Sequence, residues 1–282
     1  MPFADSCAAV RPGEHACCRF AHARDRRRIA AAFVAEALTR GNKVIYLCDR
    51  DPETLVAELA AEDDRVENAI GSGQLDVRPA RGAYAPQGRF DVEGMLLIAR
   101  DERDRALAEG YPALSLTGEM GWADASLPGF ERLAEYERRL AELMERAGLV
   151  VLCQYDAGGP LGPATLSDVA AAHQVDLSPE LAALSRTGTL WGARSDEGRV
   201  LRLTGDLDFE CADALAAVLA AHFHGPLHLD LADLGFVDVT GMRALRGHKG
   251  QRLTISGTSA AVRRMLQMLA WDTDPDVEVL VA

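Results

Sequence analysis

The sequence predicts an α/β protein made of two units. Apolar runs of strand length alternate with stretches of helical period along most of the 282 residues. This alternation is typical of a mostly parallel sheet with helices on both faces. The alternation of strand-like and helical stretches restarts with shorter elements after residues 178–187, where turn residues flank a short helical stretch. We therefore expect an N-terminal unit over residues 1–185 and a smaller unit over residues 186–282.

The first unit alternates predicted strands and helices from its start. KVIYLCD (43–49) has the pattern of a buried parallel strand, because its apolar and β-branched residues stand between turn residues. The other strands are expected at 14–20, 74–80, 113–120 and 148–156. Apolar residues at helical spacing predict helices at 24–40, 91–109, 128–147 and 163–172, and Asp51-Pro52-Glu53 begins a further helix with proline in its first turn.

The second unit is predicted to begin with a β-hairpin. Residues 189–208 contain two strand-like runs, with Asp196-Glu197-Gly198 as the turn between them. Strands are then expected at 226–231, 252–257 and 276–282, and helices at 209–223, 239–248 and 259–270.

Bulk composition excludes several classes of protein. No apolar run approaches the roughly 18 residues of a membrane span, and the N-terminus lacks the pattern of a secretory signal. We therefore expect a cytoplasmic protein with no membrane partner. The net charge of −13 argues against direct binding of nucleic acid, which needs a basic face. The six cysteines are widely spread, which predicts reduced and mostly buried thiols. The oligomeric state stays open, a homodimer included.

The C-terminal unit resembles a STAS domain, the anti-sigma-factor-antagonist family. The residues that carry the resemblance lie within 190–282 and read VLRLTGDLD, LHLDLADLGFVDVTGMRAL and LTISGTSAAVRRMLQML. The family's most specific motif is a loop of aspartate, two hydroxyl residues and glycine at a helix start. The resemblance implies binding to a protein partner, typically an anti-sigma factor or switch-type serine kinase. It also implies that phosphorylation just after the aspartate breaks the complex.

This chain departs from the motif at the phosphorylated position. Asp238, Thr240 and Gly241 match the pattern, but Val239 replaces the phosphoacceptor and has no hydroxyl group. Asp238 is expected to cap the helix at 239–248, where a carboxylate is favoured by the helix dipole. We expect a partner-binding loop that works without the standard phosphoacceptor. Thr240 as a substitute acceptor, and a purely structural role for the loop, stay open.

Residues 10–177 resemble a MEDS domain, the sensory module named from methanogens and methylotrophs. The matching stretches include PGEHACCRF, ALTRGNKVIYLCD, GSGQLDVRPARGAY, EGYPALSLTGEMGWA, LAEYERRL and VVLCQYD. The resemblance implies a fold distantly similar to RecA- and KaiC-type proteins. It also implies that the unit senses small molecules, such as hydrocarbon derivatives, and passes the signal to an output domain.

Candidate ligand-binding residues follow from the predicted strands. In a parallel sheet, binding sites gather at the carboxyl ends of the strands, so we expect one common neighbourhood there. Aromatic and apolar groups would hold the ligand and polar groups would orient it. The candidates are His15, Cys17, Glu119, Trp122, Gln154 and Tyr155.

Enzyme activity is the hypothesis that competes with small-molecule binding. The phosphate-binding loop of RecA-type ATPases needs G-x-x-x-x-G-K-[ST], which the chain lacks. We therefore predict no catalytic residue, no cofactor and no enzyme activity. The alternative is a degenerate RecA-like NTPase, or a thiol- or metal-dependent enzyme using His15, Cys17 and Glu119.

Metal binding by His15, Cys17, Cys18 or Cys153 is a further alternative. Adjacent cysteines point to opposite faces of a strand, so only His15 and Cys17 would share a face. No bound metal is predicted on that basis. A core that simply buries the cysteines and aromatics stays open as well.

Overall fold

The computed structural model describes residues 10, 13–85, 87–123, 126–144, 148–177, 181, 184, 189–195, 199–247 and 251–280. They form two compact units, residues 10–176 and the described residues from Leu177 onward. The predicted boundary at 185/186 falls in a stretch of which only Leu181 and Leu184 are described.

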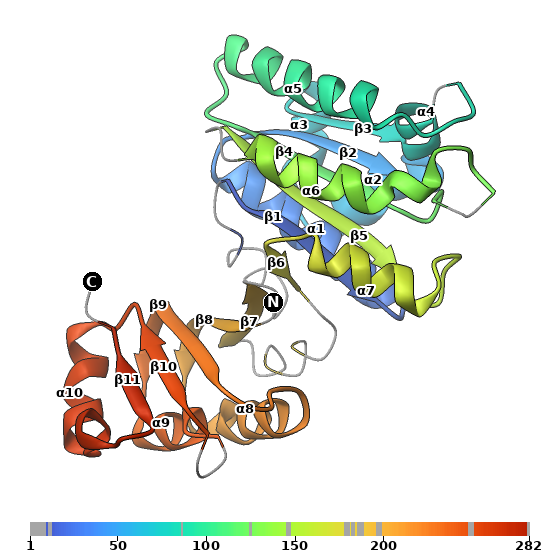
Figure 1. The fold of residues 1–282 in the computed structure, drawn as a ribbon. Coiled ribbons are helices and arrows are strands. Elements are labelled where there is room, and N and C mark those ends of the chain that lie inside the picture. Colours follow the sequence, from blue (N-terminus) through green and yellow to red (C-terminus); the bar gives the residue numbers. More distant parts are fainter. Residues whose placement is uncertain are drawn as a thin grey trace. The chain divides into compact units, whose positions relative to one another are not determined.

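A parallel sheet forms the centre of the first unit (Figure 1). Its strands lie in the order β6-β1-β5-β4-β2-β3. Their bounds are β1 His15–Phe20, β2 Lys43–Cys48, β3 Leu75–Pro79, β4 Leu114–Glu119, β5 Leu149–Asp156 and β6 Val175–Asp176. The predicted parallel sheet is confirmed, and the two-residue strand β6 was not predicted.

Helices cover both faces of this sheet (Figure 1). One core, on the side of α1, α2 and α3, contains Tyr46 of β2. The other core, on the side of α5, α6 and α7, contains Cys153 of β5. The bounds are α1 Ala23–Thr39, α2 Pro52–Ala60, α3 Arg65–Gly71, α4 Ala80–Tyr84, α5 Val92–Ala108, α6 Leu133–Met144 and α7 Pro163–Ala171. The helices α3 and α4 were not predicted.

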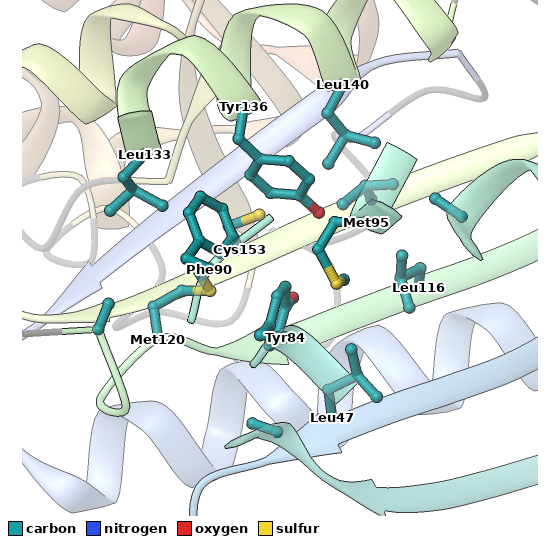
Figure 2. Close-up of a cluster of buried hydrophobic side chains, with 14 of the residues drawn as sticks. Leu47, Tyr84, Phe90, Met95, Leu116, Met120, Leu133, Tyr136, Leu140 and Cys153 are labelled. Carbon is teal, nitrogen blue, oxygen red and sulfur yellow. The ribbon is translucent and has the colours of Figure 1, made fainter. Parts of the chain in front are cut away.

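An aromatic cluster fills the core on the α5–α6 side (Figure 2). Tyr84 stacks on Trp122 with 4.6 Å between ring centroids, and Phe90 meets Tyr136 edge-on at 5.4 Å. A Cβ atom at Gly118 would lie 2.2 Å from the hydroxyl of Tyr84, so only glycine lets this ring lie against β4. The sheet and this cluster therefore determine each other's packing.

The second unit is a smaller sheet with three α-helices among its described residues. The strands lie in the order β7-β8-β9-β10-β11, with β7 and β8 antiparallel and the other described pairs parallel. The bounds are β7 Leu190–Ser195, β8 Val200–Leu207, β9 Leu227–Val237, β10 Leu253–Ser256, β11 Val277–Val279, α8 Phe209–His222, α9 Val239–Leu245 and α10 Ala260–Met268. The predicted turn at 196–198 lies outside the described residues.

Two predicted boundaries need correction. Strand β9 continues to Val237, whereas the sequence pattern predicted an end at residue 231. Its pairing with β8 is irregular near Asp206, and this irregularity breaks the alternation of buried and exposed residues. Helix α6 begins at Leu133, after a short 3-10 turn, and not at residue 128. Within the described residues, no helix is both long and apolar enough to cross a membrane.

Candidate functional site

The sheet of the first unit divides the predicted ligand-binding residues between its two faces. Gln154 and Tyr155 are neighbours on β5, and successive side chains of a strand point to opposite faces. The expectation of one neighbourhood is therefore wrong. Glu119 and Gln154 lie on the α1–α2 side, while His15, Cys17, Trp122 and Tyr155 lie on the α5–α7 side. His15 also begins β1, so it does not lie at the carboxyl end of a strand.

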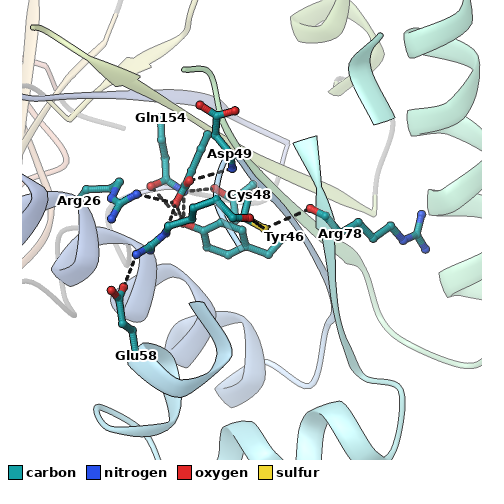
Figure 3. Close-up of polar contacts among 10 residues, drawn as sticks. Arg26, Tyr46, Cys48, Asp49, Glu58, Arg78 and Gln154 are labelled. Atoms are coloured by element: carbon teal, nitrogen blue, oxygen red, sulfur yellow. Dashed lines mark hydrogen bonds and ion pairs between the residues drawn. The ribbon is translucent and has the colours of Figure 1, made fainter. Parts of the chain in front are cut away.

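A hydrogen-bonded network that includes Tyr46, Asp49 and Gln154 lies on the α1–α2 side of the sheet (Figure 3). The hydroxyl of Tyr46 donates to Glu119 Oε1 at 3.0 Å, and the backbone N–H of Asp49 donates to Glu119 Oε2 at 3.0 Å. Gln154 Nε2 donates to the Tyr46 hydroxyl at 3.0 Å and to Thr117 Oγ1 at 2.8 Å. These contacts hold the carboxylate in place at the carboxyl ends of β2 and β4.

Two arginines neutralise this buried carboxylate. Arg26 Nη1 lies 3.3 Å and Arg50 Nε 3.4 Å from Glu119 Oε1. Arg50 also pairs with Glu58 at 2.5 Å. Burial, and secondly the charge of Glu119, raise the pKa of Asp49 above its ordinary value. The site is therefore an ion-paired cluster in which Glu119 is neutralised by Arg26 and Arg50.

A second polar cluster lies buried on the opposite side of the sheet. His15 Nε2 lies 3.2 Å from Glu137 Oε2 and 3.4 Å from Cys153 Sγ. His173 Nε2 lies 3.4 Å from Glu137 Oε2, and Cys153 Sγ lies 3.6 Å from the same oxygen. The hydroxyl of Tyr155 donates to Glu137 Oε1. One ligand atom from each of His15, Glu137, Cys153 and His173 lies within 4.8 Å of the others, so these four residues have the arrangement of a metal-binding set.

Burial controls the protonation of this cluster. It lowers the pKa of His15 and of His173 to about 3, so both rings are neutral near pH 7. It also raises the pKa of the Glu137 carboxyl, against the opposing influence of His173. Burial, followed by the charge of Glu137, raises the pKa of the Cys153 thiol. Burial therefore shifts each of these four groups towards its neutral form.

Sequence reasoning missed Glu137 and His173. Glu137 did leave a signal, because it lies four residues after Leu133 and three before Leu140, on the buried stripe of α6. A charged residue on the buried face of an amphipathic helix needs a partner. His173 lies in the segment between α7 and β6, and no periodicity in the sequence marks it.

Cys17 lies in a setting that suppresses thiol reactivity. It is fully buried, and burial, with the charge of Asp176 next, raises its pKa well above the ordinary value. Reactive cysteines are instead partly exposed and lie near positive charge. Since Glu119 lies across the sheet from His15 and Cys17, the three do not form one catalytic set. The described cysteines, Cys17, Cys18, Cys48, Cys153 and Cys211, are buried free thiols, as predicted.

Trp122 belongs to the aromatic cluster and borders a cavity through Tyr84. The indole is 7% exposed, and its face is covered by the Tyr84 ring. A cavity of about 390 Å³ opens beside this ring. It is lined by Tyr84, Gln87, Arg89, Asp91, Gly94, Met95 and Ile98. Its volume lies within the roughly 300–1,000 Å³ range of small-molecule sites.

The predicted loop of the second unit forms a capped helix start. Asp238 Oδ1 accepts a hydrogen bond from the backbone N–H of Gly241 at 2.7 Å, so Asp238 caps α9 as predicted. Asp238 Oδ2 accepts a second hydrogen bond, at 3.1 Å, from the backbone N–H of Phe209 at the start of α8. One carboxylate therefore ties the first turns of α8 and α9 together. Thr240 is exposed beside it.

Exposed apolar side chains surround this cap. Phe209 is 67% exposed, Phe236 54% and Val239 45%. The three residues lie next to Asp238, which accepts the hydrogen bond from Phe209 and follows the end of β9. We call Phe209, Phe236, Asp238 and Val239 the loop surface. Apolar groups gathered around one acidic residue are typical of a surface that meets another protein.

Comparison with known families places the chain in the class of sensory-domain proteins. Residues 14–174 match the family model described as MEDS, the methanogen/methylotroph, DcmR sensory domain. Because this match spans more than half of the 282 residues, the chain belongs to the MEDS family. Residues 192–282 match the model described as Mlab, STAS domain. The expected order of the two domains is confirmed, and the pair supports a signalling or regulatory role.

Solved structures resemble part of the chain at low sequence identity. One is a KaiC-like protein of Pyrococcus horikoshii, with 12% identity and a TM-score of 0.43 over 60% of this chain and 73% of that one. Another is the flagellar accessory protein FlaH of Methanocaldococcus jannaschii, with 12% identity and a TM-score of 0.39 over 60% of this chain and 72% of that one. No curated protein matches the chain.

Proposed function

We propose that the chain is a regulatory protein whose second unit binds an anti-sigma factor or switch-type serine kinase through the loop surface. The observation that carries this proposal is the exposure of Phe209, Phe236 and Val239 around the capping carboxylate of Asp238. Aromatic side chains are enriched at the centres of protein interfaces. The carboxylate adds a charged group that selects a basic partner surface.

Binding at this surface is not released by phosphorylation of residue 239. A phosphate there would add about two negative charges beside Asp238 and disrupt an apolar interface. Valine has no hydroxyl group to accept a phosphate, and it contributes exposed apolar area instead. The partner therefore stays bound under conditions in which a serine at this position would be modified.

The loop surface is tested with a purified anti-sigma factor of the serine-kinase type. Val239→Asp places a second carboxylate beside Asp238, and we expect it to weaken binding at least tenfold. Met268→Asp is the matched control, because Met268 is 75% exposed on α10 and outside the loop surface. Equal affinities of the Val239→Asp variant and the native chain would reject the proposed interface.

The first unit binds a small, partly apolar molecule in the cavity beside Tyr84. Support comes from the cavity volume of about 390 Å³ and from its mixture of apolar and charged lining residues. Ile98→Trp fills part of this cavity from α5, and we expect it to abolish binding of short-chain hydrocarbon derivatives followed by calorimetry. Leu107→Trp is the control, because Leu107 lies on the same helix, is similarly exposed and does not line the cavity. A ligand that binds both variants equally would place the sensory site elsewhere.

The protein acts by binding and not by turnover. The Glu119 cluster satisfies its own charges with Arg26 and Arg50. ATP hydrolysis by the native chain, abolished in Glu119→Gln, would overturn this reading and favour the degenerate NTPase.

A further inference from the structure

We propose that His15, Glu137, Cys153 and His173 bind one Zn²⁺ ion in the interior of the first unit. The four side chains come from separate elements: β1, α6, β5 and the segment between α7 and β6. None of them is more than 5% exposed. The site shares no residue with the loop surface or with the lining of the cavity beside Tyr84. The zinc proposal therefore does not depend on the proposed function.

The separations between the donor atoms fit a tetrahedral zinc site. Bonds of about 2.0–2.2 Å to nitrogen and oxygen place two such donors about 3.4 Å apart, and a thiolate at about 2.3 Å lies about 3.6 Å from either. The observed separations from Glu137 Oε2 are 3.2 Å to His15 Nε2 and 3.4 Å to His173 Nε2. The Cys153 sulfur lies 3.4 Å from His15 Nε2 and 3.6 Å from Glu137 Oε2. These four separations match a tetrahedral site, and all four donor atoms lie within 4.8 Å of one another.

Hydrogen bonds outside the donor set orient the ligands. His173 Nδ1 lies 2.8 Å from the backbone carbonyl of Val169, so this nitrogen carries the proton and Nε2 presents its lone pair to the cluster. His173 Nε2 is buried and makes no hydrogen bond with the described residues. Tyr155 donates to Glu137 Oε1 and leaves Oε2 facing the histidines. Metal-binding histidines and carboxylates are usually held by such secondary contacts.

The charge of the donor set matches a divalent cation. A thiolate and a carboxylate together carry two negative charges, and the neutral imidazoles add none. Burying two anions without a cation is costly, and a divalent cation would offset their charge. Binding of Zn²⁺ would release the thiol proton of Cys153 to solvent. The sulfur and nitrogen donors also disfavour Mg²⁺ and Ca²⁺, which prefer oxygen.

Four protein ligands leave no position open for substrate. A closed tetrahedral site is typical of structural zinc and not of catalytic zinc. His173 stands two residues before β6, the strand that ends the first unit. The ion would therefore fix the last segment of this unit to α6 and to the centre of the sheet.

Metal content is the direct test. We expect the full-length chain, purified without a metal-affinity step, to retain one equivalent of zinc by inductively coupled plasma mass spectrometry. After removal of the metal with a chelator and a reductant, Co²⁺ should bind. The bound Co²⁺ should produce the intense visible bands of a tetrahedral site and, separately, a thiolate-to-cobalt charge-transfer band. Metal-free protein that binds neither Co²⁺ nor Zn²⁺ would overturn the proposal.

Variants identify the ligands. Cys153→Ser and His173→Gln should each lower Zn²⁺ affinity at least tenfold, whereas Cys48→Ser and His222→Gln should bind as tightly as the native chain. Because a ligand variant can fail to fold, the native chain provides a second readout: added Zn²⁺ should raise the thermal midpoint of the metal-free protein, since an ion bound only by the folded state stabilises it. An unchanged midpoint, or equal losses in the control variants, would reject the site.

Discussion

Removal of the Asp238 carboxylate tests how the loop surface is built. Asp238→Ala deletes the cap of α9 and the hydrogen bond to the backbone N–H of Phe209. Loss of an N-cap costs about 1 kcal/mol. Loss of the second hydrogen bond, which links two helices, costs about 0.5–1.5 kcal/mol. We therefore expect the free energy of unfolding of the second unit to fall by about 2 kcal/mol.

The matched variant is Asp238→Asn. Asparagine is about as good an N-cap as aspartate, and its single side-chain oxygen can accept the hydrogen bond from Gly241. We expect this variant to lose about 1 kcal/mol less than the alanine variant, because the cap to Gly241 is kept and only the second hydrogen bond and the charge are affected. Partner affinity should fall in the alanine variant, where the starts of α8 and α9 are no longer tied together.

Urea titration followed by far-ultraviolet circular dichroism measures the loss. Hydrogen exchange followed by mass spectrometry assigns it, since faster exchange should be confined to residues near the starts of α8 and α9. The reasoning would be refuted if Asp238→Ala unfolded at the same urea concentration as the native chain. Equal losses in the alanine and asparagine variants would show that the charge or the hydrogen bond from Phe209, and not the cap, is responsible.

Three further outcomes follow from single contacts. Gly241→Ala places a Cβ atom 2.5 Å from a backbone oxygen at the end of β8, so it should destabilise the second unit by at least about 2 kcal/mol. Gly71→Ala is the control, because its Cβ atom meets nothing within 4 Å, and it should be neutral or stabilising in the same urea titration. Tyr46→Phe removes a hydroxyl that donates to a buried carboxylate, so the free energy of unfolding should fall by about 1.5–3 kcal/mol. Tyr111→Phe is the control, because its ring is only partly buried, and it should lower the free energy of unfolding by less than about 0.5 kcal/mol. Equal losses in the two variants would contradict the network. Val239→Ser restores the missing acceptor, so a switch-type kinase should phosphorylate residue 239 in this variant alone, as mapped by mass spectrometry; phosphate on the native loop would contradict the loss of the switch.

Local sequence patterns predicted most of the helices and strands. They gave a wrong strand end where pairing with a neighbouring strand determines the end. The buried strand at 43–49 and the helix after Asp51-Pro52 were recognisable because apolar period and proline placement are properties of neighbouring residues. Strand β9 was predicted too short because its last residues are held by irregular pairing with β8. No local pattern records that pairing.

The candidate site residues also divide into those that a local pattern identifies and those that only distant contacts identify. Asp238 was assignable as a cap because capping depends on residues three positions apart. The sequence offered His15 and Cys153 as candidate metal ligands but not as one set with Glu137 and His173, since the four are separated by up to 158 residues, from His15 to His173. Glu137 could have been suspected from its place on the buried stripe of α6, but no local pattern joins it to the other three.

The sequence by itself determined the two α/β units, their order along the chain and the loop in which valine replaces a hydroxyl residue, because period, turn chemistry and motif spacing are written in adjacent residues. Only the tertiary structure decided which polar side chains meet. Successive residues of β5 face opposite sides of a buried sheet, so Gln154 joins Glu119 on one side. On the other side, Cys153 joins two histidines and a buried glutamate that come from β1, α6 and the segment before β6.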